Sequence, residues 1–171
     1  NSCHFRCGKG GIRKVAKSKE RAKVVSKNNF LTAVGLASSA SGFAALTVAA
    51  CDAIGLNLGR KELSIIARQG SGSSCRSIYG GYVEWLAAKT SEKSYAAQIA
   101  DENYFDIRDI AVVVEAAKRR YTTRESMQAS VRTSPLYGAR LKTVARNLKV
   151  VRKAILGKDF TNLGSIAELD S

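Results

Sequence analysis

The chain has 171 residues, of which 45% are hydrophobic, so it is long enough to bury a core, and an intrinsically disordered tail is excluded. Its formal net charge of +14 is concentrated in residues 1–30 and 118–153. This charge favours an anionic partner such as nucleic acid, a phosphorylated metabolite or an anionic lipid; the alternative is that it lies on solvated helix faces. The longest apolar run, residues 37–58, is interrupted by serines, threonines and Asp52, so we expect no membrane span.

The four cysteines are few and scattered, which is typical of reduced thiols and favours a cytoplasmic protein. They are Cys3, Cys7, Cys51 and Cys75. Cys3, His4 and Cys7 could form half of a metal site, but no second pair follows at zinc spacing, so we expect no metal ligands there. The chain opens on Asn1 and closes inside an amphipathic helical pattern, so we expect a piece of a longer protein.

Residues 27–42 predict a phosphate-binding loop that runs into a helix. Gly35 allows the backbone to pass close to an anion, and Ser38 and Ser39 are favoured N-cap residues. The unpaired N–H groups at the start of a helix then point at the anion. A short strand predicted over residues 23–26 would supply a strand–turn–helix context. The alternative is an ordinary serine-capped core helix.

A second anion-binding stretch is predicted further along the chain. The helix predicted over residues 38–54 is apolar on nearly all sides, as buried helices are, and another helix is predicted over residues 60–69. In residues 70–77, which follow, two glycines and four serines accompany Arg76. Backbone N–H groups, hydroxyls and a planar guanidinium together suit a phosphate or a carboxylate. The alternative is a flexible linker, for which Gly and Ser are common.

The rest of the chain mixes strands and helices. Strands are predicted over residues 79–86, 94–100 and 107–116, and helices over residues 136–156 and 160–169. The run of β-branched residues in the third strand is typical of a central buried strand. The fold class is therefore expected to be mixed α and β.

One more helix is predicted to begin within residues 121–127, with Thr122 or Thr123 as its cap. Arg124 then lies near the positive end of the helix dipole, which disfavours a cation. A bound anion at this helix start would explain the arginine.

The helix over residues 136–156 carries apolar residues at helical spacing, and we expect these to face inward: Leu141, Val144, Leu148, Val151 and Ile155. Its basic residues lie mainly on the other sides: Arg140, Lys142, Arg146, Lys149, Arg152 and Lys153. A nucleic-acid-binding module built on this helix is the alternative of another class. It has no aromatic interleaving and no recognised binding motif, so specific nucleic-acid binding is not expected.

The chain has no GxxxxGK[ST] loop, no GxGxxG and no Ser/His/Asp set, which excludes the standard hydrolase and dehydrogenase interpretations. Several stretches, in order and at near-family spacing, instead resemble the diphosphomevalonate (mevalonate pyrophosphate) decarboxylases of the GHMP kinase superfamily. These are residues 28–30, 35–40, 68–73, 75–77, 79–81, 83–85 and 133–136. The resemblance covers the chain from about Lys23 to Ser171.

The resemblance implies an α+β, GHMP kinase-like fold. Residues 1–103 would form a partial N-terminal ATP-binding domain of the ribosomal protein S5 domain 2 type, and residues 104–171 an incomplete ferredoxin-like C-terminal domain. It also implies phosphorylation of the 3-hydroxyl of mevalonate diphosphate with MgATP, followed by loss of phosphate and CO2 to give isopentenyl diphosphate. A phosphomevalonate decarboxylase or a mevalonate kinase variant is the alternative. The complete enzyme would be a homodimer.

Site residues also follow from the resemblance. Residues at the loop would hold the ATP phosphates: Asn29, Gly35, Leu36, Ala37, Ser38 and Ser39. Residues of the second stretch would bind the substrate's diphosphate: Ser71, Gly72 and Ser73. Arg76 would pair, in a catalytic role, with the carboxylate that leaves as CO2. Thr123 and Arg124 would also reach the diphosphate.

The chain departs from the family pattern at Leu31, Ser74 and Ser126, where the family has proline, alanine and glycine. The family's N-terminal strand motif and the segment with its catalytic aspartate have no counterpart in this sequence. Asp52, in the predicted buried helix, and Glu84, in a predicted strand, are not expected to replace that aspartate. We therefore expect the chain to be a partial segment that binds anions without turnover.

Overall fold

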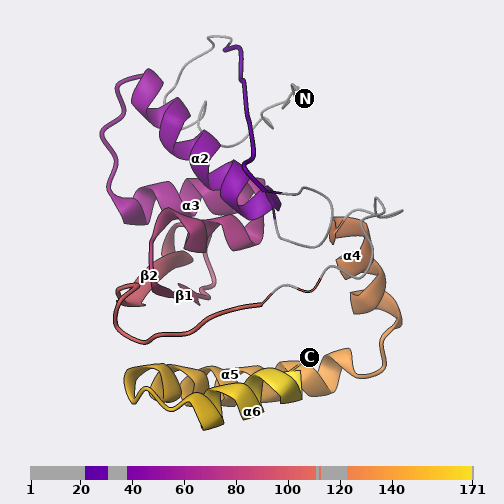
Figure 1. Cartoon of the computed structure of the whole chain (residues 1–171). Coiled ribbons are helices and arrows are strands. Elements are labelled where there is room, and N and C mark those ends of the chain that lie inside the picture. Colours follow the sequence, from indigo (N-terminus) through magenta and orange to yellow (C-terminus); the bar gives the residue numbers. More distant parts are fainter. Residues whose placement is uncertain (1–21, 31–37, 111, 113–122, 171) are drawn as a thin grey trace. The chain divides into compact units, whose positions relative to one another are not determined.

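The computed structural model describes residues 22–30, 38–110, 112 and 123–170 (Figure 1). The chain divides into two compact units, Asn1–Asp101 and Glu102–Ser171. Helices and an antiparallel pair of strands occur together, so the expected mixture of α and β structure is confirmed. The assignment of residues 1–103 and 104–171 to an ATP-binding and a C-terminal domain stays a prediction.

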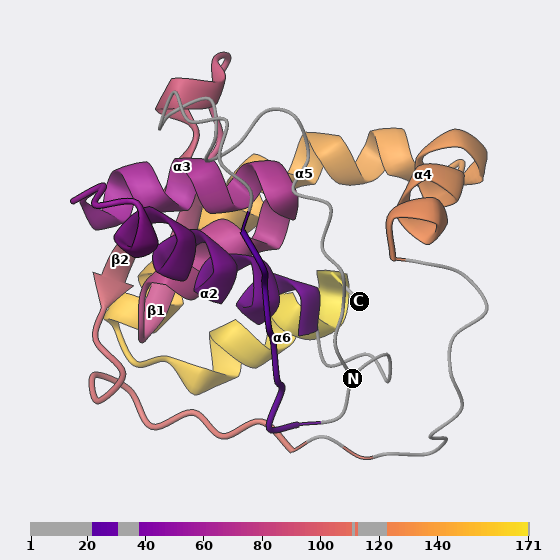
Figure 2. The ribbon, with the colours of Figure 1, turned by 90° about the horizontal axis from the view of Figure 1, so that it is seen from above.

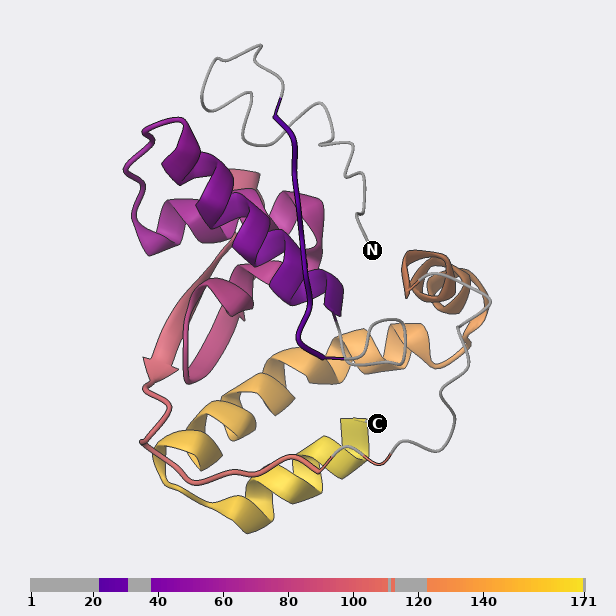
Figure 3. The ribbon, with the colours of Figure 1, turned by 45° about the horizontal axis from the view of Figure 1, so that its top comes forward.

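The described part of the first unit contains two α-helices, two short 3-10 helices and a β-hairpin. The elements are α2 (Ser38–Ala53), α3 (Arg60–Gly70), η1 (Gly72–Ile78), β1 (Tyr82–Leu86), η2 (Ser91–Lys93) and β2 (Tyr95–Ala100). The two strands pair antiparallel (Figure 3), and in their register Trp85 lies opposite Ala96. The helix predicted over residues 60–69 and the strand predicted over residues 94–100 are confirmed to within a residue.

Helices α2 and α3 form an antiparallel hairpin. Towards the turn, Cys51 of α2 and Ile66 of α3 form a small apolar core against which Leu63 packs. At the other end, Phe43 of α2 lies against Gly70, because a Cβ added to Gly70 would overlap the Phe43 ring. The amino end of α2 and the carboxyl end of α3 therefore lie side by side (Figure 1).

Helix α2 is buried on one side only, which corrects the expectation of a helix buried all round. Its buried residues recur every three or four positions: Ala40, Ala44, Thr47 and Cys51. On another side, Val48 is 45% exposed. Small residues occupy every side of this helix, so its composition does not distinguish the face that α3 and η1 cover.

Two predicted strands are wrong where the structure describes them. Residues 23–26 belong to no strand, and Val25 is 75% exposed, because no other described segment pairs with them. Residues 107–110 and 112 also lie outside any strand. The remaining positions of the strand predicted over 107–116 lie outside the described residues.

In its described part, the second unit is helical. It contains α4 (Thr123–Thr133), α5 (Tyr137–Leu156) and α6 (Phe160–Asp170), close to the predicted ranges. Arg140 near the start of α5 pairs with Asp170 at the end of α6, with 2.6 Å between Nη2 and Oδ2. The two helices are therefore antiparallel neighbours (Figure 2).

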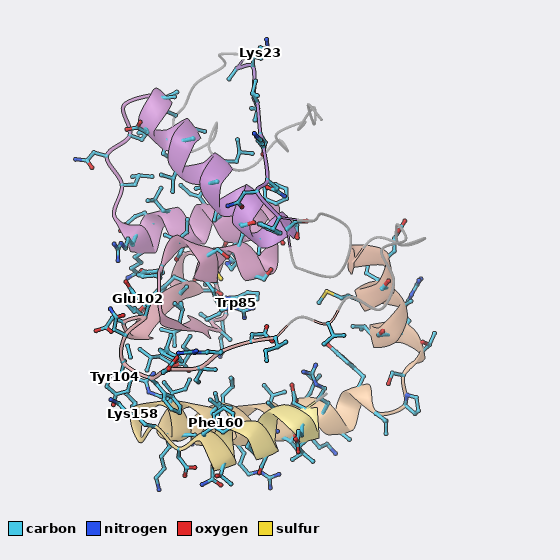
Figure 4. All side chains as sticks on the ribbon, in the orientation of Figure 1. Lys23, Trp85, Glu102, Tyr104, Lys158 and Phe160 are labelled. Carbon is cyan, nitrogen blue, oxygen red and sulfur yellow. The ribbon has the colours of Figure 1, made fainter. Side chains whose placement is uncertain are left out.

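The turn between α5 and α6 is held by its own polar contacts. Asp159 caps α6, since its Oδ1 accepts a hydrogen bond from the backbone N–H of Asn162 at 3.0 Å. Lys158, and not Gly157, adopts the left-handed conformation, with φ 53°. Its ammonium lies 4.7 Å from the centre of the Tyr104 ring (Figure 4), and the Tyr104 hydroxyl donates to the Leu156 carbonyl at 2.6 Å.

The inward face predicted for α5 is partly wrong. Ile155 is buried, and Val144 and Val151 are half-buried, but Leu141 and Leu148 are 56% and 47% exposed. Helical spacing of apolar residues alone therefore does not predict which side chains of α5 are covered. Among the helices that the structure describes, none is both long enough and apolar enough to cross a membrane.

Candidate functional site

The first predicted anion site centres on the start of α2. Ser38 is half-buried and Ser39 exposed, both in the first described turn, and the Ser38 carbonyl accepts a hydrogen bond from Ser41 Oγ at 3.2 Å. Asn29 lies exposed in a bend. The remaining predicted loop residues, Gly35, Leu36 and Ala37, lie outside the described residues, as does Leu31, so the cap itself stays a prediction.

The second predicted site is a 3-10 helix over most of its length, which is not the flexible linker given as the alternative. Ser71 is extended, with φ −148° and ψ 129°, and η1 begins at Gly72. Along η1, Ser73 is half-buried, whereas Arg76 is exposed. The Arg76 carbonyl accepts a hydrogen bond from the Tyr79 N–H at 3.1 Å, whereas its guanidinium has no hydrogen-bond or ion-pair partner among the described residues.

Ser74 fastens η1 to the end of α3. Its side chain is fully buried, and its Oγ lies 2.5 Å from both the Ala67 and the Ser71 carbonyl oxygens. A serine at this position, where the family resemblance would have alanine, is therefore accommodated, because its one hydroxyl hydrogen can be donated to either carbonyl. Cys75 adds a thiol contact to the Gly72 carbonyl at 3.1 Å.

Trp85 of β1 lies against the other side of η1. A Cβ added to Gly72 would lie 3.1 Å from Trp85 Cη2, which is tighter than ordinary contact, so only glycine fits there without a shift. The indole Nε1 donates to Ser94 Oγ at 2.9 Å. In the sequence, only the place of Trp85 in the family-like motif of residues 83–85 indicates a role beyond that of a strand residue.

The antiparallel hairpin of α2 and α3 brings the two predicted sites to one end of the first unit. Phe43, four residues after Ser39, packs against Gly70, the residue before Ser71. Helix α2 also contacts η1 directly. The start of α2 and the serine stretch are thus neighbours, as a pocket for a nucleotide beside a second phosphorylated ligand requires.

The electrostatics of the second site are positive. Burial raises the pKa of the Cys75 thiol, while the charges of Arg76 and Arg68 oppose that rise. Cys51 and Cys75 are both free and buried. Within the described ranges, no group of three or more His, Cys, Asp or Glu side chains could hold a metal ion, while Cys3, His4 and Cys7 lie outside them.

The third predicted anion contact belongs to the second unit. Arg124 lies in the first turn of α4, as predicted, so its backbone lies at the positive end of a helix. Thr123 is the first residue of that helix, and the other predicted cap, Thr122, lies outside the described residues. The side chains of Thr123 and Arg124 lie outside what the structure describes. A shallow hollow on the same helix is lined by Met127, Gln128, Val131 and Arg132 and includes none of the predicted site residues.

Neither acid weighed in the sequence analysis lies where a catalytic acid is expected. Asp52 is exposed near the end of α2, which corrects its expected burial, and it lies at the opposite end of that helix from Ser39. Glu84 is half-buried in β1.

Comparisons with known proteins agree with this architecture. Residues 9–96 match the diphosphomevalonate decarboxylase-like N-terminal domain, and residues 110–171 match the mevalonate 5-diphosphate decarboxylase C-terminal domain. The diphosphomevalonate decarboxylase mvd1 of Aspergillus fumigatus is 44% identical over 153 residues, which are 87% of this chain and 38% of that protein.

Two solved structures are similar in fold. One, described as MDDEF in complex with MVAPP, AMPPCP and magnesium, has a TM-score of 0.81 and 41% identity, over 92% of this chain and 49% of that one. The other concerns mevalonate diphosphate mediated ATP binding by the mevalonate diphosphate decarboxylase of Enterococcus faecalis, with a TM-score of 0.76, 40% identity, and 92% and 48% of the two chains.

The chain spans less than half the length of each of these three proteins. The GHMP kinase-like α+β fold that the resemblance implied is confirmed by these neighbours. With a family model that covers more than half of its residues, the chain belongs to the diphosphomevalonate decarboxylase family.

Proposed function

We propose that this chain is part of an enzyme that decarboxylates mevalonate 5-diphosphate to isopentenyl diphosphate at the expense of ATP. The observation that carries the proposal is the contact of Phe43 with Gly70, which keeps the start of α2 beside the serine stretch. Two anion-binding stretches at one end of a single unit suit a nucleotide and a phosphorylated acid. The E. faecalis relative, whose ATP binding is described as mediated by mevalonate diphosphate, supports the same pairing.

Each stretch has a proposed role. Asn29 and residues 35–39 bind the ATP phosphates, with backbone N–H groups at the start of α2 pointing at them. Ser71, Gly72 and Ser73 bind the substrate's diphosphate. Thr123 and Arg124, at the start of α4 in the second unit, bind phosphate. The ligand set of the neighbour described with MVAPP, AMPPCP and magnesium supports both ligand classes. Mg²⁺ would arrive on the nucleotide's phosphates, because the described residues offer no cluster of acidic ligands.

Arg76 has the central chemical role. Its exposed guanidinium pairs with the substrate carboxylate and holds the breaking C–C bond in line with the leaving group at C3. Phosphorylation of the 3-hydroxyl, which ATP supplies, makes that group a better leaving group. The positive charge already lies beside the carboxylate and the departing phosphate. The protein therefore does not have to rearrange its charges when the C–C bond breaks.

Asp52 lies at the far end of α2 from Ser39, and Glu84 is half-buried in β1. We therefore propose that neither activates the 3-hydroxyl and that the chain by itself binds these ligands without turnover. Incubation with MgATP and mevalonate 5-diphosphate should release no CO2. Sustained release would mean that a residue of this chain serves as the catalytic acid. Homodimer formation by the complete enzyme and a cytoplasmic location remain predictions.

Binding provides the direct test. Calorimetric titration of the chain with mevalonate 5-diphosphate should show saturable binding, and Arg76→Gln should weaken it about tenfold or more, since a charge-assisted hydrogen bond contributes about 1.5–3 kcal/mol. Arg146→Gln, on the exposed surface of α5, is the matched control and should change nothing. Equal affinity of the two variants would contradict the role of Arg76. Tighter, steeply salt-dependent binding to DNA would favour the nucleic-acid alternative.

A further inference from the structure

Trp85 is the only tryptophan of the chain, and its ring lies against the backbone of η1. A Cβ added to Gly72 would lie 3.1 Å from Cη2 and 3.4 Å from Cζ3 of the indole. Gly72 is the first residue of η1 and lies between the two serines, Ser71 and Ser73, that are predicted to bind a diphosphate. The ring therefore packs against the middle of the proposed anion site, and 36% of Trp85 remains exposed.

The indole is itself fixed by polar contacts that lead back to α3. Its Nε1 donates to Ser94 Oγ at 2.9 Å, and the buried Ser94 offers its carbonyl to Arg68 Nε at 3.2 Å. Arg68 also donates from Nη2 to the Ser91 carbonyl at 3.1 Å. Arg68 lies two residues before Gly70, the last residue of α3. The carboxyl end of α3 therefore leads into η1 and also holds, through Ser94, the Trp85 indole that packs against η1.

Ser74 provides a second contact that holds η1 against α3. Its hydroxyl, fully buried, reaches the Ala67 carbonyl at 2.5 Å. Between Ser74 and the indole, the backbone of residues 71–73 has little room to shift. Preorganised donors bind an anion more tightly than mobile ones, because less ordering free energy is lost on binding.

We propose that Trp85 is a positioning residue for the anion-binding stretch of residues 71–76, held in place by the hydroxyl of Ser94. The inference rests on the proposed function, and it names the residue that sets the backbone of the diphosphate site. Trp85 touches no ligand in this role; it acts through Gly72.

The first test needs no ligand. Hydrogen exchange of the amides in residues 72–78 should be faster in Ser94→Ala than in the unchanged chain, because the indole loses the acceptor of its N–H bond. Ser64→Ala is the matched control. Ser64 is a buried serine of the same unit whose Oγ accepts from the Ala96 N–H at 3.1 Å and does not contact Trp85. Unchanged exchange in Ser94→Ala, or an equal increase in Ser64→Ala, would overturn the proposal.

The second test separates positioning from general destabilisation. Affinity for mevalonate 5-diphosphate, measured by calorimetry, should fall about three- to tenfold in Ser94→Ala and stay unchanged in Ser64→Ala. Affinity for AMPPCP should be the same in both variants. In the unchanged chain, Trp85 emission should change saturably as mevalonate 5-diphosphate is added.

The outcomes distinguish the two proposals. If the unchanged chain binds mevalonate 5-diphosphate and Arg76→Gln does not, but Ser94→Ala binds normally, Trp85 is not a positioning residue and the proposed function stands. If the unchanged chain binds no mevalonate 5-diphosphate, the proposed function fails, and the exchange data still decide whether Trp85 holds η1.

Discussion

Phe43 lies so close to the Gly70 backbone that a Cβ on Gly70 would overlap three carbons of the ring. The contact joins the first turns of α2 to the last residue of α3. Because Ser71 follows directly, this contact helps to hold the two predicted anion-binding stretches together. The packing of Phe43 on Gly70 therefore bears directly on the proposed binding of two anionic ligands.

Gly70→Ala should lower the free energy of unfolding of the first unit by about 1–3 kcal/mol, because the Phe43 ring must move to make room for the methyl group. Urea unfolding followed by Trp85 fluorescence measures this unit. Gly42→Ala, in α2, meets no atom within 4 Å and is the matched control. It should gain up to about 1 kcal/mol from helix propensity. Equal gains in both variants would show that Phe43 does not pack on Gly70.

Ser74→Ala should cost the first unit about 1 kcal/mol, because the buried hydroxyl no longer bridges η1 to the Ala67 carbonyl. The same urea measurement applies. Ser77→Ala, an exposed serine of the same 3-10 helix, should stay within about 0.5 kcal/mol of the unchanged chain. A Ser74→Ala variant as stable as Ser77→Ala would mean that the hydroxyl carries no net stabilisation.

The sequence predicted the regular elements well where periodicity or composition marks a boundary. The observed bounds of helix α3 and strand β2 lie within one residue of the predicted bounds. Helix α5 begins only one residue after its predicted start, because Pro135 marks that boundary in the sequence. The conformation of residues 72–78 could not be predicted. Glycine and serine suit a loop as well as a 3-10 helix, and only the tertiary contacts of Ser74 and Trp85 decide between them.

Tertiary contacts that the sequence does not reveal also explain the other differences between the predicted and the observed structure. A strand forms only with a partner, so the β-branched residues of positions 23–26 do not suffice when no described segment pairs with them. On α2 the small residues are spread evenly, so the buried stripe follows from the neighbours α3 and η1 and not from the sequence of the helix. The nearness of the two anion-binding stretches likewise comes from the hairpin geometry.

Cys75 should react slowly with iodoacetamide at neutral pH. Burial raises its pKa, so less of the reactive thiolate is present than for a free cysteine, and the side chain is inaccessible. Mass spectrometric mapping of the modified residue, before and after unfolding in urea, measures the difference. In Arg76→Gln the pKa should rise further, since the arginine charge opposes the effect of burial. Modification as fast as that of a free cysteine in the folded chain would contradict the prediction.

The second unit should lose stability in acid through two aspartates. The hydrogen bonds from Arg140 lower the pKa of Asp170, and those from the backbone and side chain of Asn162 lower the pKa of Asp159. A carboxyl group with a lowered pKa in the folded state stabilises that state above its unfolded pKa. This stabilisation is lost as the pH falls through the folded pKa. Unfolding of α5 and α6 should therefore become easier below the ordinary range of aspartate.

Salt distinguishes the two causes. The Arg140–Asp170 pair is exposed, so at about 1 M salt, where the Debye length is about 3 Å, the pKa of Asp170 should move towards its ordinary value. Asp159 accepts from uncharged N–H groups at a helix start, so its pKa should respond less. NMR titration of both carboxyl groups tests this. Arg140→Gln should raise the pKa of Asp170 alone, and Lys142→Gln, an exposed neighbour on α5, should change neither. A response of Asp159 equal to that of Asp170 would show that long-range charge, and not the local hydrogen bonds, sets both values.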